Sequence, residues 1–175
     1  MISIDEIVSQ YPIVQYQVLN SQEIPFSEKV RHICRTECER YGRSWSCPPA
    51  VGEVKACRQQ CLTYKQALIF TTLAEVSDAS IMSETLATRA GHEDVTRAIC
   101  EELKRSGAEV LPLSSESCQI CEECAYPNAC RFPGKAIPCV ESYGILVTEI
   151  AEKCGMEFYY DSQTVTWFGI IFFNL

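Results

Sequence analysis

Two groups of cysteines in this chain have a spacing that suits metal ligation. The chain has 175 residues, and 12 of them are cysteines. The C-terminal cysteine group follows the pattern Cys-x2-Cys-x2-Cys-x5-Cys and consists of Cys118, Cys121, Cys124 and Cys130. The N-terminal cysteine group follows the pattern Cys-x3-Cys-x8-Cys-Pro-Pro and consists of Cys34, Cys38 and Cys47. Thiols gathered in this way are easier to explain by metal binding than by packing, so the sequence predicts an iron–sulfur protein.

The spacing of the C-terminal cysteine group matches a [4Fe–4S] cluster. Three thiolates at positions i, i+3 and i+6 of a non-helical loop can reach three irons of a cubane. Cys130 then supplies the fourth thiolate, or it reaches across to a different cluster as in two-cluster ferredoxins, and the sequence leaves both arrangements open. Zinc is the competing metal, but structural zinc loops usually contribute cysteines two at a time. A run of three therefore favours iron–sulfur over zinc.

The N-terminal cysteine group predicts a second metal site with an incomplete ligand set. The candidates for its fourth ligand are Cys57, Cys61, Cys130 and a non-cysteine residue such as His32. Without a fourth ligand, the site would resemble an enzyme cluster that leaves one iron open for a substrate. Radical enzymes that bind S-adenosylmethionine in this way use Cys-x3-Cys-x2-Cys, and the x8 gap here argues against them. The remaining alternative is a zinc-stabilised binding module, in which the metals only fold the cysteine loops.

Four other cysteines suit hydrophobic packing. Cys57 and Cys61 lie on the apolar stripe of a predicted helix over residues 52–64. Small buried thiols are common in protein cores, so packing is the favoured role of both residues. Cys100 and Cys154 are interpreted in the same way.

Strands that alternate with helices predict an α/β fold. Short apolar and β-branched runs predict strands over residues 12–19, 67–73, 109–113, 156–160 and 164–173. Apolar residues at helical spacing predict helices over residues 52–64, 79–106 and 138–154, with a kink near Gly91. The last two strands are expected to form an antiparallel pair, with the second of them inside the sheet. The expected architecture is a mixed β-sheet packed with helices.

One domain is expected to span residues 1–175. A chain of this length with 47% hydrophobic residues can bury a core of its own. Cysteine-rich metal-binding loops are predicted at 32–50 and 114–136, where turn-forming residues replace the apolar periodicity.

Aromatic and basic residues accompany the cysteines. Tyr41, Trp45 and Tyr126 interleave with them and are expected to shield the clusters from water. A cubane with four thiolates is anionic, and Arg131, Lys135 and a helix starting at Pro138 would offset its charge.

Two stretches of the chain resemble the signatures of a family of predicted metal-binding proteins, domain of unknown function 2284. The first stretch runs from Cys34 through Gly42 and continues as Trp45-Ser46-Cys47-Pro48-Pro49, and the second runs from Cys118 through Ile145. The resemblance covers nearly the whole chain and implies metal binding. Where the family pattern leads us to expect Ser after Pro138, this chain has Cys139, and we leave Cys139 out of the predicted ligands.

Composition excludes several classes of function. A formal net charge of −8 argues against nucleic acid, whose binding needs clustered Lys and Arg. The longest apolar run, residues 167–173, is far shorter than the roughly 20 residues of a membrane-spanning helix. The N-terminus lacks the pattern of a secretory signal, so we expect a cytoplasmic protein with reduced thiols. Its expected partner is a redox protein or a small molecule.

Motifs for other chemistry are missing from the sequence. It contains no phosphate-binding glycine loop and no Gly-x-Ser-x-Gly elbow. His92 is expected at the surface or at a helix start, and His32 in a loop. We therefore assign no residue to acid–base catalysis.

Overall fold

Two long strands form the centre of the sheet in the computed structural model, which describes residues 3–175. The sheet consists of β1 (Gln15–Asn20), β2 (Gln66–Glu75), β3 (Glu109–Leu113) and β4 (Thr164–Asn174). Its order is β1-β2-β4-β3, and β2 and β4 pair along ten residues each. Both central strands are rich in β-branched and aromatic residues, which favour extended structure.

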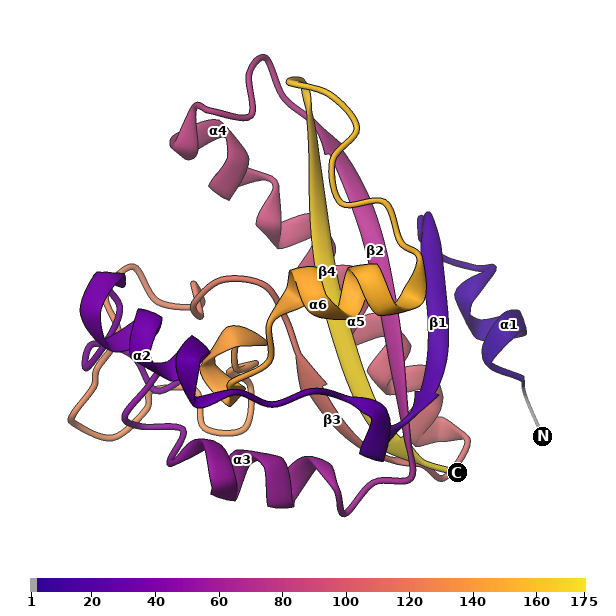
Figure 1. Ribbon diagram of the computed structural model, residues 1–175, viewed down its shortest axis with the longest axis horizontal. Coiled ribbons are helices and arrows are strands. Elements are labelled where there is room, and N and C mark those ends of the chain that lie inside the picture. Colours follow the sequence, from indigo (N-terminus) through magenta and orange to yellow (C-terminus); the bar gives the residue numbers. More distant parts are fainter. Residues whose placement is uncertain (1–2) are drawn as a thin grey trace.

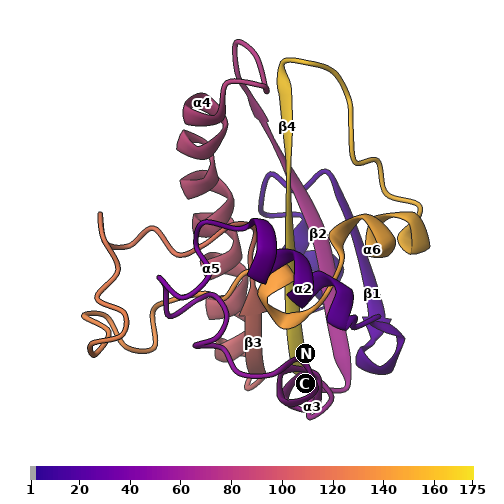
Figure 2. The same cartoon turned by 60° about the vertical axis from the view of Figure 1, so that its left-hand side comes forward.

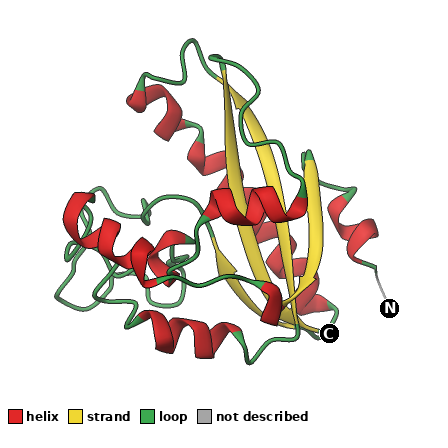
Figure 3. Ribbon diagram, in the orientation of Figure 1, coloured by secondary structure: helices red, strands yellow, loops and turns green. Residues whose placement is uncertain are grey.

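Helices cover both faces of this sheet (Figures 1 and 3). The α-helices are α1 (Ile4–Val8), α2 (Glu28–Glu37), α3 (Val54–Cys61), α4 (Met82–Ala87), α5 (Arg89–Arg105) and α6 (Val147–Cys154). Two 3-10 helices, η1 (Ser21–Glu23) and η2 (Glu141–Tyr143), complete the helical elements. α1 and α5 lie on one face, whereas α3, α6 and η2 pack against the other.

The two faces of β4 contribute to different hydrophobic clusters. Ile171 and Phe173 pack with residues of α5, while Ile170 and Phe172 pack with residues of α6. This alternation is the period of two that an extended chain imposes on its side chains. The prediction that the last strand lies inside the sheet is confirmed, because β4 pairs with β2 on one side and with β3 on the other.

The predicted combination of helices and sheet is confirmed, but the sheet is antiparallel between all its strands rather than mixed. The predicted strand at 156–160 is wrong, since these residues form no strand. Both edges of β4 are already taken by β2 and β3, so this segment cannot form the predicted antiparallel pair with β4. Phe158 and Tyr159 are instead exposed.

Two predicted helices are each divided in the structure. The helix predicted over 79–106 is divided at Thr88 into α4 and α5, and α5 continues through Gly91. The helix predicted from Pro138 is divided into η2 and α6 by Gly144, which has φ 82°. A Cβ on Gly144 would lie 2.7 Å from a methyl group of Val54, so close packing against α3 requires glycine here.

Gly169 offers a test of how tightly the sheet packs. It faces Phe70 across the β2–β4 ladder, and an added Cβ would lie 2.7 Å from Phe70 Cε1 and 3.2 Å from His92 Nε2. Because Phe70 is fully buried and cannot move aside, Gly169→Ala should lower the free energy of unfolding by about 1–3 kcal/mol. Denaturant unfolding measures this change.

Gly91→Ala is the matched control for Gly169→Ala. Gly91 lies within α5, and an added Cβ there meets nothing within 4 Å. Alanine favours the helix, so Gly91→Ala should raise the free energy of unfolding by up to about 1 kcal/mol. Equal effects of the two substitutions would contradict the packing argument.

Candidate metal centres

The four thiols of the C-terminal cysteine group line one small cavity. Its volume is about 20 Å³, and all four cysteines belong to the loop between β3 and η2. Ser44 and Trp45 from the segment after α2 also line this cavity, so the two cysteine-rich segments lie side by side (Figure 2). Cys130 therefore lies with the other members of its own group, and not with the N-terminal cysteine group.

The N-terminal cysteine group lines a second cavity, of about 420 Å³. Cys34 lies within α2, Cys38 is the residue that ends this helix, and Cys47 follows in a turn-rich segment. The predicted loop at 32–50 therefore begins as a helix. The thiol of Cys139 lines the same cavity, although this residue is absent from the predicted ligand set.

The two cavities differ in size and in their walls. The larger one is bordered by aromatic residues, among them Tyr41, Phe158 and Phe168. Its volume falls in the range of about 300–1,000 Å³ that is typical of small-molecule sites. The smaller one is lined by Trp45 and Phe132, and the Trp45 ring packs edge-on against Tyr126 at 5.1 Å between ring centroids. Of the aromatic residues predicted to shield the clusters, Tyr41 lines the larger cavity and Trp45 lines the smaller one.

The remaining cysteines and His32 line neither of these two cavities. Cys57 and Cys61 belong to the core beneath α3, which agrees with the predicted packing role. Cys100 is buried among residues of α5, and Cys154 packs on the core beneath α6. His32 is exposed on α2 and does not line the larger cavity.

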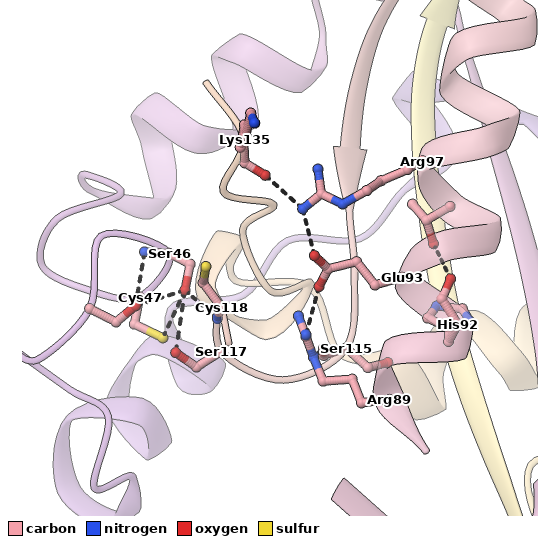
Figure 4. Close-up of polar contacts among 12 residues, drawn as sticks. Ser46, Cys47, Arg89, His92, Glu93, Arg97, Ser115, Ser117, Cys118 and Lys135 are labelled. Atoms are coloured by element: carbon pink, nitrogen blue, oxygen red, sulfur yellow. Dashed lines mark hydrogen bonds and ion pairs between the residues drawn. The ribbon is translucent and has the colours of Figure 1, made fainter. Parts of the chain in front are cut away.

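Ser46 joins the two cavities through hydrogen bonds (Figure 4). Its hydroxyl accepts a hydrogen bond from the Cys118 N–H at 2.8 Å and lies 3.8 Å from Cys47 Sγ. The same hydroxyl lies 2.9 Å from Ser44 Oγ and 3.3 Å from Ser117 Oγ. Ser46 is 1% exposed, so water does not compete for these contacts. One cysteine of each group is thereby held to the same buried side chain.

A chain of charged residues on α5 anchors the C-terminal cysteine loop (Figure 4). Arg89 donates to the Ser115 carbonyl at 2.8 Å and forms an ion pair with Glu93 at 2.6 Å. Glu93 also pairs with Arg97 at 2.5 Å, and Arg97 donates to the Lys135 carbonyl at 2.7 Å. Helix α5 thus contacts the backbone near both ends of the loop.

Burial opposes the charged form of several candidate ligands. Desolvation is the main reason that the pKa values of the Cys34, Cys47 and Cys118 thiols are raised. Metal binding requires thiolates and releases protons, so a bound cation is what would stabilise these groups in their charged form.

Cys124 differs from those three thiols because its pKa is lowered. Desolvation acts against this, but it is outweighed by the backbone N–H groups of Tyr126 and Trp45, the Ser44 hydroxyl and the charge of Arg131. Arg131 also lines the smaller cavity, as expected for a residue that offsets cluster charge. Hydrogen bonds and positive charge that stabilise a thiolate also tune a cluster bound to it.

Arg31 is a buried cation near the N-terminal cysteine group. It is 3% exposed and donates to the carbonyls of Gly52 and Ser142, each at 2.7 Å. Its charge acts to lower the pKa of Cys34, against the larger effect of burial. Arg31 is absent from the predicted site residues because only the packing of α2 against η2 buries it.

His92 is buried, contrary to the predicted surface position. It is 2% exposed, its Nδ1 lies 2.8 Å from Thr72 Oγ1, and its ring stacks on Phe70. Its position on the sheet-facing side of α5 explains the error, because the local sequence does not reveal which face of a helix a polar residue occupies.

The burial of His92 predicts a loss of stability in mild acid. Desolvation lowers the pKa of His92 from 6.5 to about 4, so the unfolded chain binds a proton there that the folded chain rejects. The stability that depends on neutral His92 is intact above pH 6.5 and is lost as the pH falls towards 4. It should amount to about 2 kcal/mol at pH 5 compared with pH 7.

Comparison with His92→Gln isolates this contribution from the titration of carboxylates. Denaturant unfolding at pH 7 and pH 5 should show a smaller loss of stability in His92→Gln than in the unsubstituted protein. His32→Gln, at the exposed histidine, should retain the full loss. A normal imidazole pKa for His92 in an NMR titration would contradict the prediction.

The donor sets at both cavities consist of thiols, which suit a soft metal or an iron–sulfur cluster. Among residues 3–175, no three His, Cys, Asp or Glu side chains converge closely enough to hold one metal ion. A zinc ion needs four ligands at about 2.0–2.3 Å, whereas a cubane binds each thiolate at a different iron. Four thiols spread around a shared cavity are therefore compatible with a cluster.

The comparison with protein families agrees with this chemistry. A family described as "Predicted metal-binding protein (DUF2284)" matches residues 17–173. The chain belongs to this family. Membership of DUF2284, together with 12 cysteines, supports a metal-binding role. The searches of curated proteins and of solved structures found no match. None of the helices described in residues 3–175 is long and apolar enough to cross a bilayer.

Proposed function

We propose that this DUF2284 protein carries electrons on [4Fe–4S] clusters, one held by the C-terminal cysteine group and a second by the N-terminal cysteine group. The observation that carries the proposal is that Cys118, Cys121, Cys124 and Cys130 line a single cavity. An all-thiol donor set selects soft metals and iron–sulfur clusters over oxygen-preferring ions. The sequence spacing supports the same cofactor.

The residues around the smaller cavity have roles that suit electron transfer. A bound cluster would supply a one-electron redox couple. The four thiolates would hold it, and Trp45 and Phe132 line the same cavity. The N–H groups and the hydroxyl that stabilise the Cys124 thiolate would set the potential together with burial.

The proximity of the two sites supports transfer between them. Cys47 and Cys118 contact the same Ser46 hydroxyl, so clusters in both sites would be neighbours. A redox protein or a small molecule would exchange electrons with this pair. A zinc-stabilised binding module, in which the metals only fold the cysteine loops, is the alternative, and acid-labile sulfide content separates the two.

Elemental analysis of anaerobically prepared protein tests the proposal. We expect about eight iron atoms and about eight acid-labile sulfides per chain, and a brown colour that bleaches on reduction. Colourless protein that contains stoichiometric zinc and no sulfide would overturn it. Cys38→Ala should lose about half of the iron, and full retention of iron in this variant would remove the second cluster from the proposal.

A further inference from the structure

We infer that Cys139 is the fourth thiolate ligand at the N-terminal cysteine group. The inference rests on the proposed iron–sulfur function and completes the ligand set of its second cluster. Cys139 lines the same cavity as Cys34, Cys38 and Cys47, so four thiols surround this site as they do the other one.

The backbone of Cys139 is fixed between the two cysteine-rich segments. A parallel bridge pairs it with Ser114, whose N–H donates to the Pro138 carbonyl at 2.9 Å. On its other side, the Cys139 N–H donates to the Ser46 carbonyl at 3.5 Å. Ser46 directly precedes Cys47 in the chain, so this contact places Cys139 beside the N-terminal cysteine group.

The side-chain surroundings of Cys139 also bring it close to that group. Its thiol donates to the Glu141 carboxylate at 3.1 Å, and the Cys34 thiol lies 4.0 Å from the Glu141 carbonyl. Cys34 and Cys139 thus approach the same residue. Cys47 is close enough for its charge to add to the effects of burial and Glu141, which together raise the pKa of Cys139.

No other residue considered for this position is equally well placed. Cys57 and Cys61 are packed in the core, and Cys130 lines the smaller cavity. His32 is exposed on α2 and does not line the larger cavity. Among residues 3–175, Cys139 is the cysteine that shares the larger cavity with the N-terminal group.

A fourth thiolate changes what the site can do. With four cysteines bound, each iron of a cubane has its protein ligand and none is left open for a substrate. The site then suits electron transfer, and the alternative of an enzyme with an open iron would require Cys139 to stay unbound. The sensitivity of the iron to an added ligand therefore distinguishes the two arrangements.

Cyanide, which binds an open iron, provides the test. In reduced, anaerobically prepared protein of native sequence, we expect cyanide to leave the paramagnetic resonance spectrum unchanged. In Cys139→Ala and Cys139→Ser, we expect one of two results: loss of about half of the iron and sulfide, or a cluster whose spectrum now changes with cyanide. Cys154→Ala is the control, because Cys154 lines neither cavity, and it should behave like the native sequence.

Two results would overturn the inference while leaving the second cluster in place. One is a cyanide-induced spectral change in the native sequence, a measurement that does not depend on the folding of any variant. The other is full iron content and no response to cyanide in both Cys139 variants, while Cys38→Ala loses about half of its iron. Full iron content in Cys38→Ala would instead show that the N-terminal cysteine group holds no cluster, and the inference about Cys139 would then be wrong as well.

Discussion

Cys121→Ala should lose about half of the iron and acid-labile sulfide that the anaerobically prepared protein contains. Cys121 is the middle member of the run of three cysteines and lines the smaller cavity. Without it, one iron of the cluster would have no protein ligand, and within residues 3–175 no fifth cysteine lines this cavity to replace it. The cluster at the N-terminal cysteine group should remain, so the loss is expected to be partial.

Cys154→Ala is the matched control for Cys121→Ala, because it removes a thiol that lines neither cavity. Cys154 is also partly buried, but it lies on α6 at the hydrophobic core. It should retain the full iron and sulfide content. If Cys121→Ala kept its full content as well, the assignment of a cluster to the C-terminal cysteine group would be wrong.

Arg89→Met should lower the free energy of unfolding by about 3 kcal/mol. Arg89 is 2% exposed, and its removal leaves the buried Glu93 carboxylate without its closest buried cation. The Ser115 carbonyl also loses its hydrogen-bond donor. Because Arg97 still pairs with Glu93, we expect a value at the low end of the range for a broken buried ion pair.

Arg105→Met is the matched control for Arg89→Met. Arg105 pairs with Glu102 on the same helix, but 68% of its side chain is exposed. An exposed pair contributes about 0–1 kcal/mol, so this variant should unfold almost as the native sequence does. The double variant Arg89→Met/Glu93→Gln should recover part of the loss, because it removes the uncompensated charge. Equal stabilities of Arg89→Met and Arg105→Met would contradict the proposed anchor.

Arg89→Met should affect the cofactor as well as stability. Ser115 accepts from Arg89 through its carbonyl, and its hydroxyl donates to the Phe168 carbonyl at 2.8 Å. These two contacts fix the start of the C-terminal cysteine loop on α5 and β4. Loosening them should reduce the iron content less than Cys121→Ala does, because all four thiols remain available.

The two groups of candidate metal ligands could be predicted from the sequence because ligand spacing is a local property. Three cysteines at every third position are found without knowledge of the fold. The same holds for the apolar runs that became β2 and β4, since an extended chain alternates its faces over a few residues. Family membership also follows from these stretches.

The errors in the predicted elements arose where tertiary contacts override local preference. Residues 156–160 have a strand-like composition, but β4 has no free edge for them. The helix expected from Pro138 breaks at Gly144 because α3 packs closely against it. His92 looks like a surface residue until α5 is placed on the sheet.

The sequence by itself determined that this chain offers clustered thiols on a helix-and-sheet scaffold, which supports a metal-binding role. Only the tertiary structure decided which thiols share a cavity. Cys130 lies with its own group, and Cys139 reaches the N-terminal group through a bridge to Ser114 and a contact with Ser46. The physical reason is that the ligands of one metal site must be close in space, and the fold decides which distant residues meet. Cys139 lies 92 positions after Cys47 and 105 after Cys34 in the chain, and it becomes their neighbour only when contacts such as those of Ser46 hold both cysteine-rich segments together.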